Sequence, residues 1–127
     1  MKNSILILIA VCSFALFSFT LPGEEANYNG GKVTYNVEKS NGVVMINLGL
    51  QNPQEYAEII VMRSDNPAKF FREVKYLGGE AIDGMSSSNV IIDKYPLPSK
   101  ITSYYKIQTI DKNGVQKSYP SVRLSLN

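Results

Sequence analysis

The sequence predicts an all-β fold, an antiparallel sandwich of two sheets built from about seven strands. Short runs in which apolar and polar residues alternate recur from residue 33 onward. Turn-forming pairs such as Asn41-Gly42 and Asn113-Gly114 separate these runs, and such pairs favour tight antiparallel connections. After residue 22 no stretch shows the apolar spacing of an amphipathic helix. The chain therefore predicts one all-β domain behind an N-terminal helical segment.

Residues 1–22 have the layout of a secretory signal peptide, which is the only helix that the sequence predicts. Lys2 supplies a positive charge, the apolar run from Ile5 to Phe19 follows, and Pro22 ends it. Cleavage after Thr20 or Gly23 is expected. The protein is thus predicted to be exported, to the periplasm, the outer cell surface or the medium.

Two alternatives to cleavage stay open. Cys12 would be the lipidated residue of a lipoprotein, or the apolar run would remain as an uncleaved anchor; only this segment links the protein to a membrane. Cys12 is the only cysteine, so the exported domain is expected to have no disulfide. Residues 23–31 are expected to form a flexible leader, and residues 32–127 the sandwich.

Seven ranges carry the predicted strands: Val33–Glu38, Val44–Leu50, Tyr56–Arg63, Phe70–Leu77, Val90–Asp93, Tyr104–Asp111 and Gln116–Leu126. The run Ile59–Met62 is too short and too β-branched for a helix and suits a central strand. Turns are predicted at Ser64–Pro67, where side chains cap the backbone, and at Asp111–Gly114. Ile82–Asn89 is predicted to be a loop.

Charge excludes some classes of partner. The chain has 13 basic and 11 acidic residues, and the signal segment holds one base and no acid, so 13 − 1 = 12 bases face 11 acids after cleavage. No run of like charge appears along the sequence. The sequence therefore predicts binding neither to nucleic acid nor to an anionic membrane surface.

Four stretches carry a family resemblance: Asn41–Leu48, then Glu58–Asp65 with Phe70-Phe71, then Tyr104–Ile107 with Asp111–Gly114, and finally Ser118–Leu126. With these residues the chain resembles a fibronectin type III-like module as found in secreted proteins of Bacteroidota. The resemblance implies an immunoglobulin/fibronectin type III-like sandwich over nearly all of the mature chain. Its motifs concern packing and turns, so it implies the fold and says little of function.

The chain departs from the family pattern at two places. Leu48 stands where the family usually has tryptophan, and Tyr35, Tyr105 and either Phe70 or Phe71 are expected to supply the missing aromatic core. The approach to Tyr104 is also longer than usual. A tyrosine corner, in which a tyrosine hydroxyl bonds to nearby upstream backbone, is therefore expected in a shifted position, with Tyr105 as its candidate.

The chain has few groups for catalysis. It has no histidine, which removes the usual general base near neutral pH and the commonest zinc ligand. The carboxylate pairs Glu55 with Glu58 and Glu80 with Asp83 are interpreted as solvated surface, and Asp111–Gly114 as a hairpin turn rather than a calcium loop. No catalytic residue, metal or cofactor is predicted, and the protein is not expected to be an enzyme.

Tyrosines are the only residues that the sequence offers for recognition. Tyr28, Tyr76, Tyr95 and Tyr119 lie outside the best inward positions, and exposed tyrosines stack on sugars or anchor protein contacts. Tyr76, Tyr95 and Tyr119 are the candidate contacts with an unknown protein or glycan partner. The predicted function is a non-catalytic module with a structural, adhesive or protein-interaction role. The alternative is a small carbohydrate- or peptide-binding protein that uses the exposed tyrosines and the loops at one end.

Overall fold

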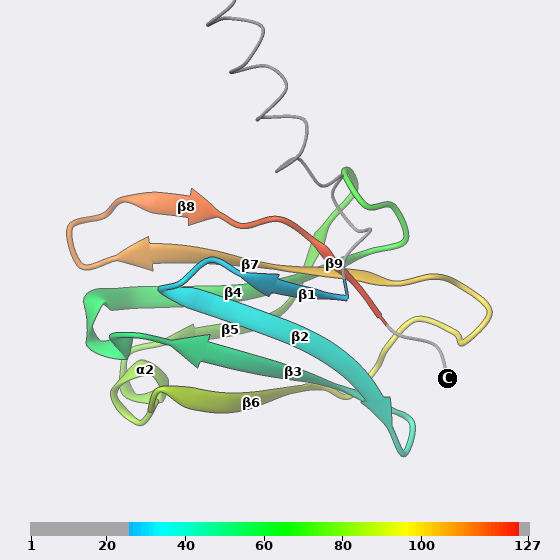
Figure 1. Ribbon diagram of the computed structural model, residues 1–127, viewed down its shortest axis with the longest axis horizontal. Helices are drawn as coiled ribbons and strands as arrows, with labels where there is room; N and C mark the ends of the chain where they lie inside the picture. The colour runs from blue at the N-terminus through cyan, green and yellow to red at the C-terminus, as the bar shows by residue number, and fades with distance from the viewer. Residues whose placement is uncertain (1–25, 125–127) are drawn as a thin grey trace, which may run out of the picture.

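The computed structural model describes residues 26–124, and within them two antiparallel sheets lie face to face (Figure 1). The predicted all-β sandwich is thus confirmed. The strands are β1 (Asn27–Asn29), β2 (Val33–Ser40), β3 (Val43–Leu50), β4 (Tyr56–Ser64), β5 (Arg72–Gly78), β6 (Ser88–Asp93), β7 (Tyr104–Asp111), β8 (Gln116–Ser118) and β9 (Val122–Arg123). Two single-turn helices, η1 (Pro53–Glu55) and α2 (Glu80–Asp83), interrupt them. The predicted signal segment lies outside the described residues.

One sheet has the strand order β1-β2-β3-β6 and the other β5-β4-β7-β8, with β9 also paired to β7. Every pairing is antiparallel, as hairpins of this length require. The turn Asn41-Gly42 joins β2 to β3, and both of its residues have positive φ, at 53° and 81°. This geometry is the one that Asn-Gly favours in a two-residue hairpin loop, so the predicted turn is confirmed.

The core lies between the two sheets and consists of the alternate residues of each strand. On β2 and β3 the inward residues are those that the alternation predicts, and Leu48 is buried at 1% exposure in place of a tryptophan. Tyr35 and Tyr105 are the largest side chains that the core buries completely. The predicted aliphatic and tyrosine interior is therefore present.

The last predicted strand is broken in two. Pro120 cannot donate a ladder hydrogen bond, and the chain leaves the strand between Ser118 and Val122. The break changes the phase of the alternation, so that Tyr119 faces inward and is 8% exposed. Tyr119 was predicted to lie outside the core, and this expectation is wrong. Residues 125–127 of the predicted strand lie outside the described residues.

Three further details differ from the sequence prediction. Asn27–Asn29 adds a strand to the sheet edge in a segment too short and polar to be predicted as one. Glu80–Asp83 forms one helical turn where only a loop was expected. Phe70 is not a core residue: it precedes β5, has a positive φ of 64° and is 76% exposed. No helix within residues 26–124 has the length and apolar character that a membrane crossing requires.

Candidate interaction surface at the loop end

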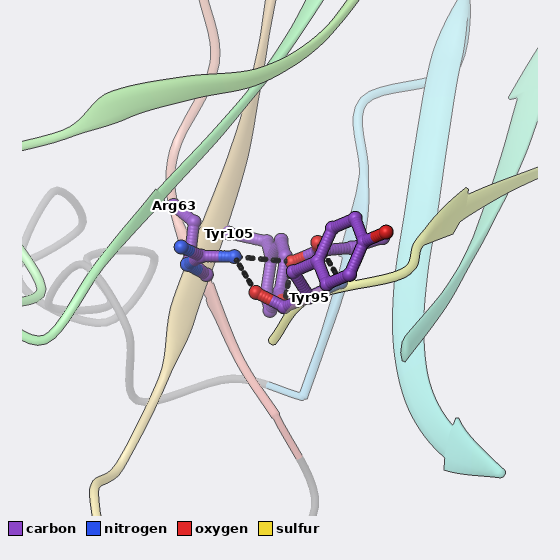
Figure 2. Close-up of polar contacts among 4 residues, drawn as sticks. Arg63, Tyr95 and Tyr105 are labelled. Carbon is purple, nitrogen blue, oxygen red and sulfur yellow. Dashed lines mark hydrogen bonds and ion pairs between the residues drawn. The ribbon is translucent and has the colours of Figure 1, made fainter. Parts of the chain in front are cut away.

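A partly buried ion pair joins the two sheets at one end of the sandwich. Arg63 comes from the end of β4 and Asp93 from the end of β6, in the opposite sheet. The Nη1 atom of Arg63 lies 2.6 Å from Oδ2 of Asp93, and the two side chains are 18% and 5% exposed. The hydroxyl of Tyr105, on β7, donates to the same Oδ2 at 2.8 Å (Figure 2). Three strands therefore meet at one carboxylate.

Tyr105 was the candidate for a tyrosine corner, and its hydroxyl bonds to a side chain instead of upstream backbone. Burial raises the pKa of the Tyr105 hydroxyl, the Asp93 carboxylate raises it further, and Arg63 lowers it in part. The hydroxyl therefore stays protonated and remains a donor. The expected corner at Tyr105 is therefore not formed. The hydroxyl of Tyr35 does donate to backbone, but to the carbonyl of Pro120, 85 residues downstream.

The ion pair also holds the main chain of Tyr95. The backbone nitrogen of Tyr95 donates to Oδ1 of Asp93 at 3.1 Å, and its carbonyl oxygen accepts from Nη1 of Arg63 at 2.9 Å. The ring itself is 84% exposed and points away from Arg63 (Figure 2). The predicted exposure of Tyr95 is thus confirmed, and the structure adds that its backbone is held in place.

The neighbouring β4–β5 loop, residues 65–71, is fixed in a similar way. Asn66 accepts from the backbone nitrogens of Ala68 and Lys69 at 2.9 and 3.0 Å, and its own nitrogen donates to Oγ of Ser64 at 3.0 Å. The predicted side-chain caps at this turn are therefore confirmed. The loop ends at Phe70, whose positive φ is uncommon for a bulky residue. Backbone strain at an exposed aromatic residue favours a functional interpretation.

An open depression of about 500 Å³ lies at this end of the sandwich. Arg63, Ser64, Asp65, Phe70, Arg72 and Leu97 line it. We call the surface formed by residues 65–71 and by the β6–β7 loop, residues 94–103, the loop end. The first loop joins two strands of one sheet, the second crosses from the other sheet to this one, and both contribute residues to this depression.

The fold gathers positive charge at the loop end and at the ends of the strands that flank it. Residues 63–72 and 93–106 contain six basic side chains, Arg63, Lys69, Arg72, Lys94, Lys100 and Lys106, against Asp65 and Asp93. These segments carry a net charge of +4, which exceeds the +2 of the whole chain. Arg63 is neutralised by Asp93, whereas Lys69, Arg72, Lys94 and Lys100 are exposed. The sequence alone does not reveal this surface, because charges that are scattered along the chain converge only after folding.

The remaining candidate tyrosines are less suited to recognition. Tyr76 is 51% exposed on the edge strand β5, and its hydroxyl donates to Oε1 of Glu58 at 2.6 Å. Hydrogen bonding to Glu58, more than burial, raises the pKa of Tyr76. Tyr119 lies in the core beside Tyr28, with ring centroids 5.8 Å apart. Of the three predicted contacts, only Tyr95 belongs to the loop end.

The carboxylates do not gather into a site. Oδ1 of Asp111 accepts from the backbone nitrogens of Asn113 and Val115, both at 2.9 Å, and Gly114 has a φ of 85°. This is the hairpin turn that the sequence predicted. Within residues 26–124 no three carboxylates or other metal-ligating side chains lie close enough to hold a metal ion.

Comparison with known proteins supports the fold. No protein-family model and no curated protein matches the chain. A Fn3-like protein from Clostridium thermocellum has a TM-score of 0.51 and 15% identity, over 72% of this chain and 85% of that one. Two crystal structures of a pectate lyase from Pectobacterium carotovorum have TM-scores of 0.53 and 14% identity, and cover 68% and 72% of this chain. The chain spans 26% of each lyase chain. Identities this low establish a shared Fn3-like fold and nothing more.

Proposed function

We propose that this protein is a non-catalytic interaction module of an exported protein system, and that it binds an acidic segment of a partner protein at the loop end. One observation carries the proposal: Phe70 and Tyr95 are 76% and 84% exposed, yet hydrogen bonds hold the backbone of Tyr95 and that of Lys69, directly before Phe70. Single exposed apolar side chains are common on protein surfaces, so it is the fixed backbone beneath these two rings, and not their exposure alone, that favours recognition.

The physical chemistry of the loop end supports protein recognition. A rigid aromatic side chain loses little conformational freedom on binding, so an exposed ring on a fixed backbone makes an efficient anchor. The surrounding lysines and Arg72 add long-range attraction for an acidic partner. Binding at this surface is therefore expected to weaken as ionic strength rises.

The non-catalytic part of the proposal is supported by the residue types available. The chain has no histidine, and its only cysteine is Cys12 in the predicted signal segment. The Fn3-like fold is consistent with a binding or spacer role, although a fold alone does not determine function. The N-terminal segment supports export, and the intact mass of the exported protein would distinguish cleavage from lipidation at Cys12.

A second candidate function is binding of an acidic glycan. The exposed rings and the cations of the loop end favour it, whereas the likeness to part of a pectate lyase concerns the fold alone. Exposed aromatic rings stack on sugars, and the cations of the loop end would pair with uronate groups. Polygalacturonate and an array of neutral and acidic glycans are the probes for this alternative.

The test is a selection of binders with matched variants. A displayed random-peptide library is selected on the exported protein, and binders are re-measured on Phe70→Asn, Tyr95→Ala and, as a control, Tyr76→Ala. Asn tolerates positive φ, so Phe70→Asn removes the ring without disturbing the loop. Acidic peptides that lose at least tenfold affinity on both loop-end variants, but not on Tyr76→Ala, would support the proposal. Binders insensitive to both variants would refute it, and polygalacturonate binding with the same pattern would favour the glycan.

A further inference from the structure

The strand β6 is the sheet edge that is least protected against pairing with another strand. Exposed edges are normally blocked by charged residues, bulges or very short strands. The edge strand β5 has Arg72, Glu73 and Lys75 and a register shift in its pairing with β4. At the other two edges, β1 and β8 have three residues each and β9 has two. Each of these edges therefore carries at least one blocking feature.

None of those features protects β6. It pairs with β3 over six consecutive residues without a register shift, and it contains no proline. Its one charged residue, Asp93, is buried and paired with Arg63. Val90 and Ile92 are 60% and 43% exposed, and Met45 lies beside Ile92 on the same outer face. In Figure 1, β6 lies at the lower margin of the molecule.

The hydrogen-bond pattern identifies which backbone groups of β6 face outward. Leu50 donates to the carbonyl of Ser87 at 3.0 Å, in the register of the β3–β6 pair. Because bonded pairs alternate along antiparallel strands, Asn89 and Ile91 bond to β3, and Val90 and Ile92 face away from it. Ser88 also faces outward, but Oγ of Ser86 already contacts its nitrogen at 3.3 Å and its carbonyl oxygen at 2.8 Å.

We propose that two copies of this chain associate through β6, antiparallel and about a two-fold axis at Ile91. In this register the outward backbone groups of Val90 bond to those of Ile92 in the partner copy. By symmetry, those of Ile92 bond to Val90 of the partner copy. On the outer face, Val90 of each copy then lies opposite Ile92 of the other copy. That Ile92 lies beside Met45 within its own copy. The two four-stranded sheets become one continuous sheet of eight strands.

A second copy fits this edge because the edge is self-complementary. An isologous interface must place each residue opposite its symmetry-related partner without conflict. Here apolar side chains oppose apolar ones, and Lys94 falls opposite Ser88, so no like charges meet across the interface. The association uses the backbone of β6, and of the loop end only Lys94, the first residue after β6, lies at its margin.

The first test is the mass of the exported protein by sedimentation equilibrium, from about 1 μM to about 1 mM, a range that spans micromolar to millimolar dissociation constants. We expect the mass of two chains for the wild type and of one chain for Val90→Lys. Val115→Lys is the matched control, because Val115 is also 60% exposed but lies in the β7–β8 turn. A wild type that stays monomeric to the highest concentration, or a Val90→Lys protein that remains dimeric, would overturn the proposal.

The second test examines the register by disulfide formation in a Cys12→Ser background, which leaves no other thiol in the chain. Residues opposite in a bonded pair have Cα atoms about 5.5 Å apart, within disulfide range, whereas diagonal neighbours lie about 7–8 Å apart. A mixture of Val90→Cys and Ile92→Cys chains should therefore cross-link at least tenfold faster than either variant alone. Equal rates in the three samples would overturn this register.

Discussion

Replacing Tyr105 with phenylalanine tests the polar network that joins the two sheets. The substitution removes one hydroxyl and leaves the ring in place, so its cost measures the bond to Asp93 with little change in packing. Donor and acceptor are 1% and 5% exposed, and the acceptor is charged. A hydrogen bond to a charged group contributes about 1.5–3 kcal/mol, so we expect the free energy of unfolding to fall by about 2 kcal/mol. For a domain of this size that is a decrease in Tm of roughly 10 °C.

The assay is urea unfolding, with the free energy of unfolding taken from linear extrapolation and the m-value checked for constancy. Tyr35→Phe is an informative comparison, because its hydroxyl donates to the neutral carbonyl of Pro120 and should be worth about 0.5–1.5 kcal/mol. Tyr104→Phe is the control, because Tyr104 directly precedes Tyr105 on β7 and its side chain lies on the opposite, outer face; the change should alter stability by less than about 0.5 kcal/mol. A double-mutant cycle with Asp93→Asn should give a coupling of about 0.5–3 kcal/mol. Loss of stability no greater in Tyr105→Phe than in Tyr104→Phe would refute the assignment of the network.

Three further predictions concern other groups. Burial raises the pKa of Tyr56 to about 12 and also raises those of Tyr35 and Tyr105. In the unfolded chain these tyrosines have a pKa near 10.0, so their contribution to the free energy of unfolding is complete below pH 10. Above pH 10 that free energy should fall by about 1.4 kcal/mol per pH unit for each tyrosine. Urea unfolding at about pH 9 and 11 would show the decrease. Ser103 is 1% exposed and its hydroxyl has no partner within residues 26–124, so Ser103→Ala should be neutral or stabilise by up to about 1 kcal/mol; a loss above that would indicate a missed bond. Phe70→Asn relieves a positive φ and should leave the urea midpoint unchanged or raise it, and a clear decrease would show that the ring supports the fold.

The strands were predictable because their information is local. On β2 and β3 the alternation alone selects the buried face, since Val33, Tyr35 and Val37 recur every second residue. The two hairpin turns were predictable because Asn-Gly and Asp-x-Asn-Gly offer the backbone conformations that these turns need. Neither the apolar periodicity of a strand nor the residue types of a turn depend on contacts with distant parts of the chain.

The departures from prediction arise where distant segments meet. Tyr119 faces inward because the strand breaks at Pro120, and the alternation after a break does not fix which residues face inward before it. The charge of the loop end depends on two loops that are separated by more than twenty residues. Asp93 alone left a local signal: it shares an inward face with Ile91, and a carboxylate in that position needs a buried partner.

At the loop end, several features that do not favour the stability of the fold lie close together. A buried ion pair such as Arg63–Asp93 is often no more stable than apolar side chains of the same volume, so its presence calls for another explanation. Here it fixes both backbone polar groups of Tyr95, whose ring contributes no burial to the fold. The positive φ of Phe70 likewise costs conformational energy to support an exposed ring. Sequences depart from locally favourable choices mainly at functional sites, and three such departures at one end of a sandwich indicate a surface shaped for contact.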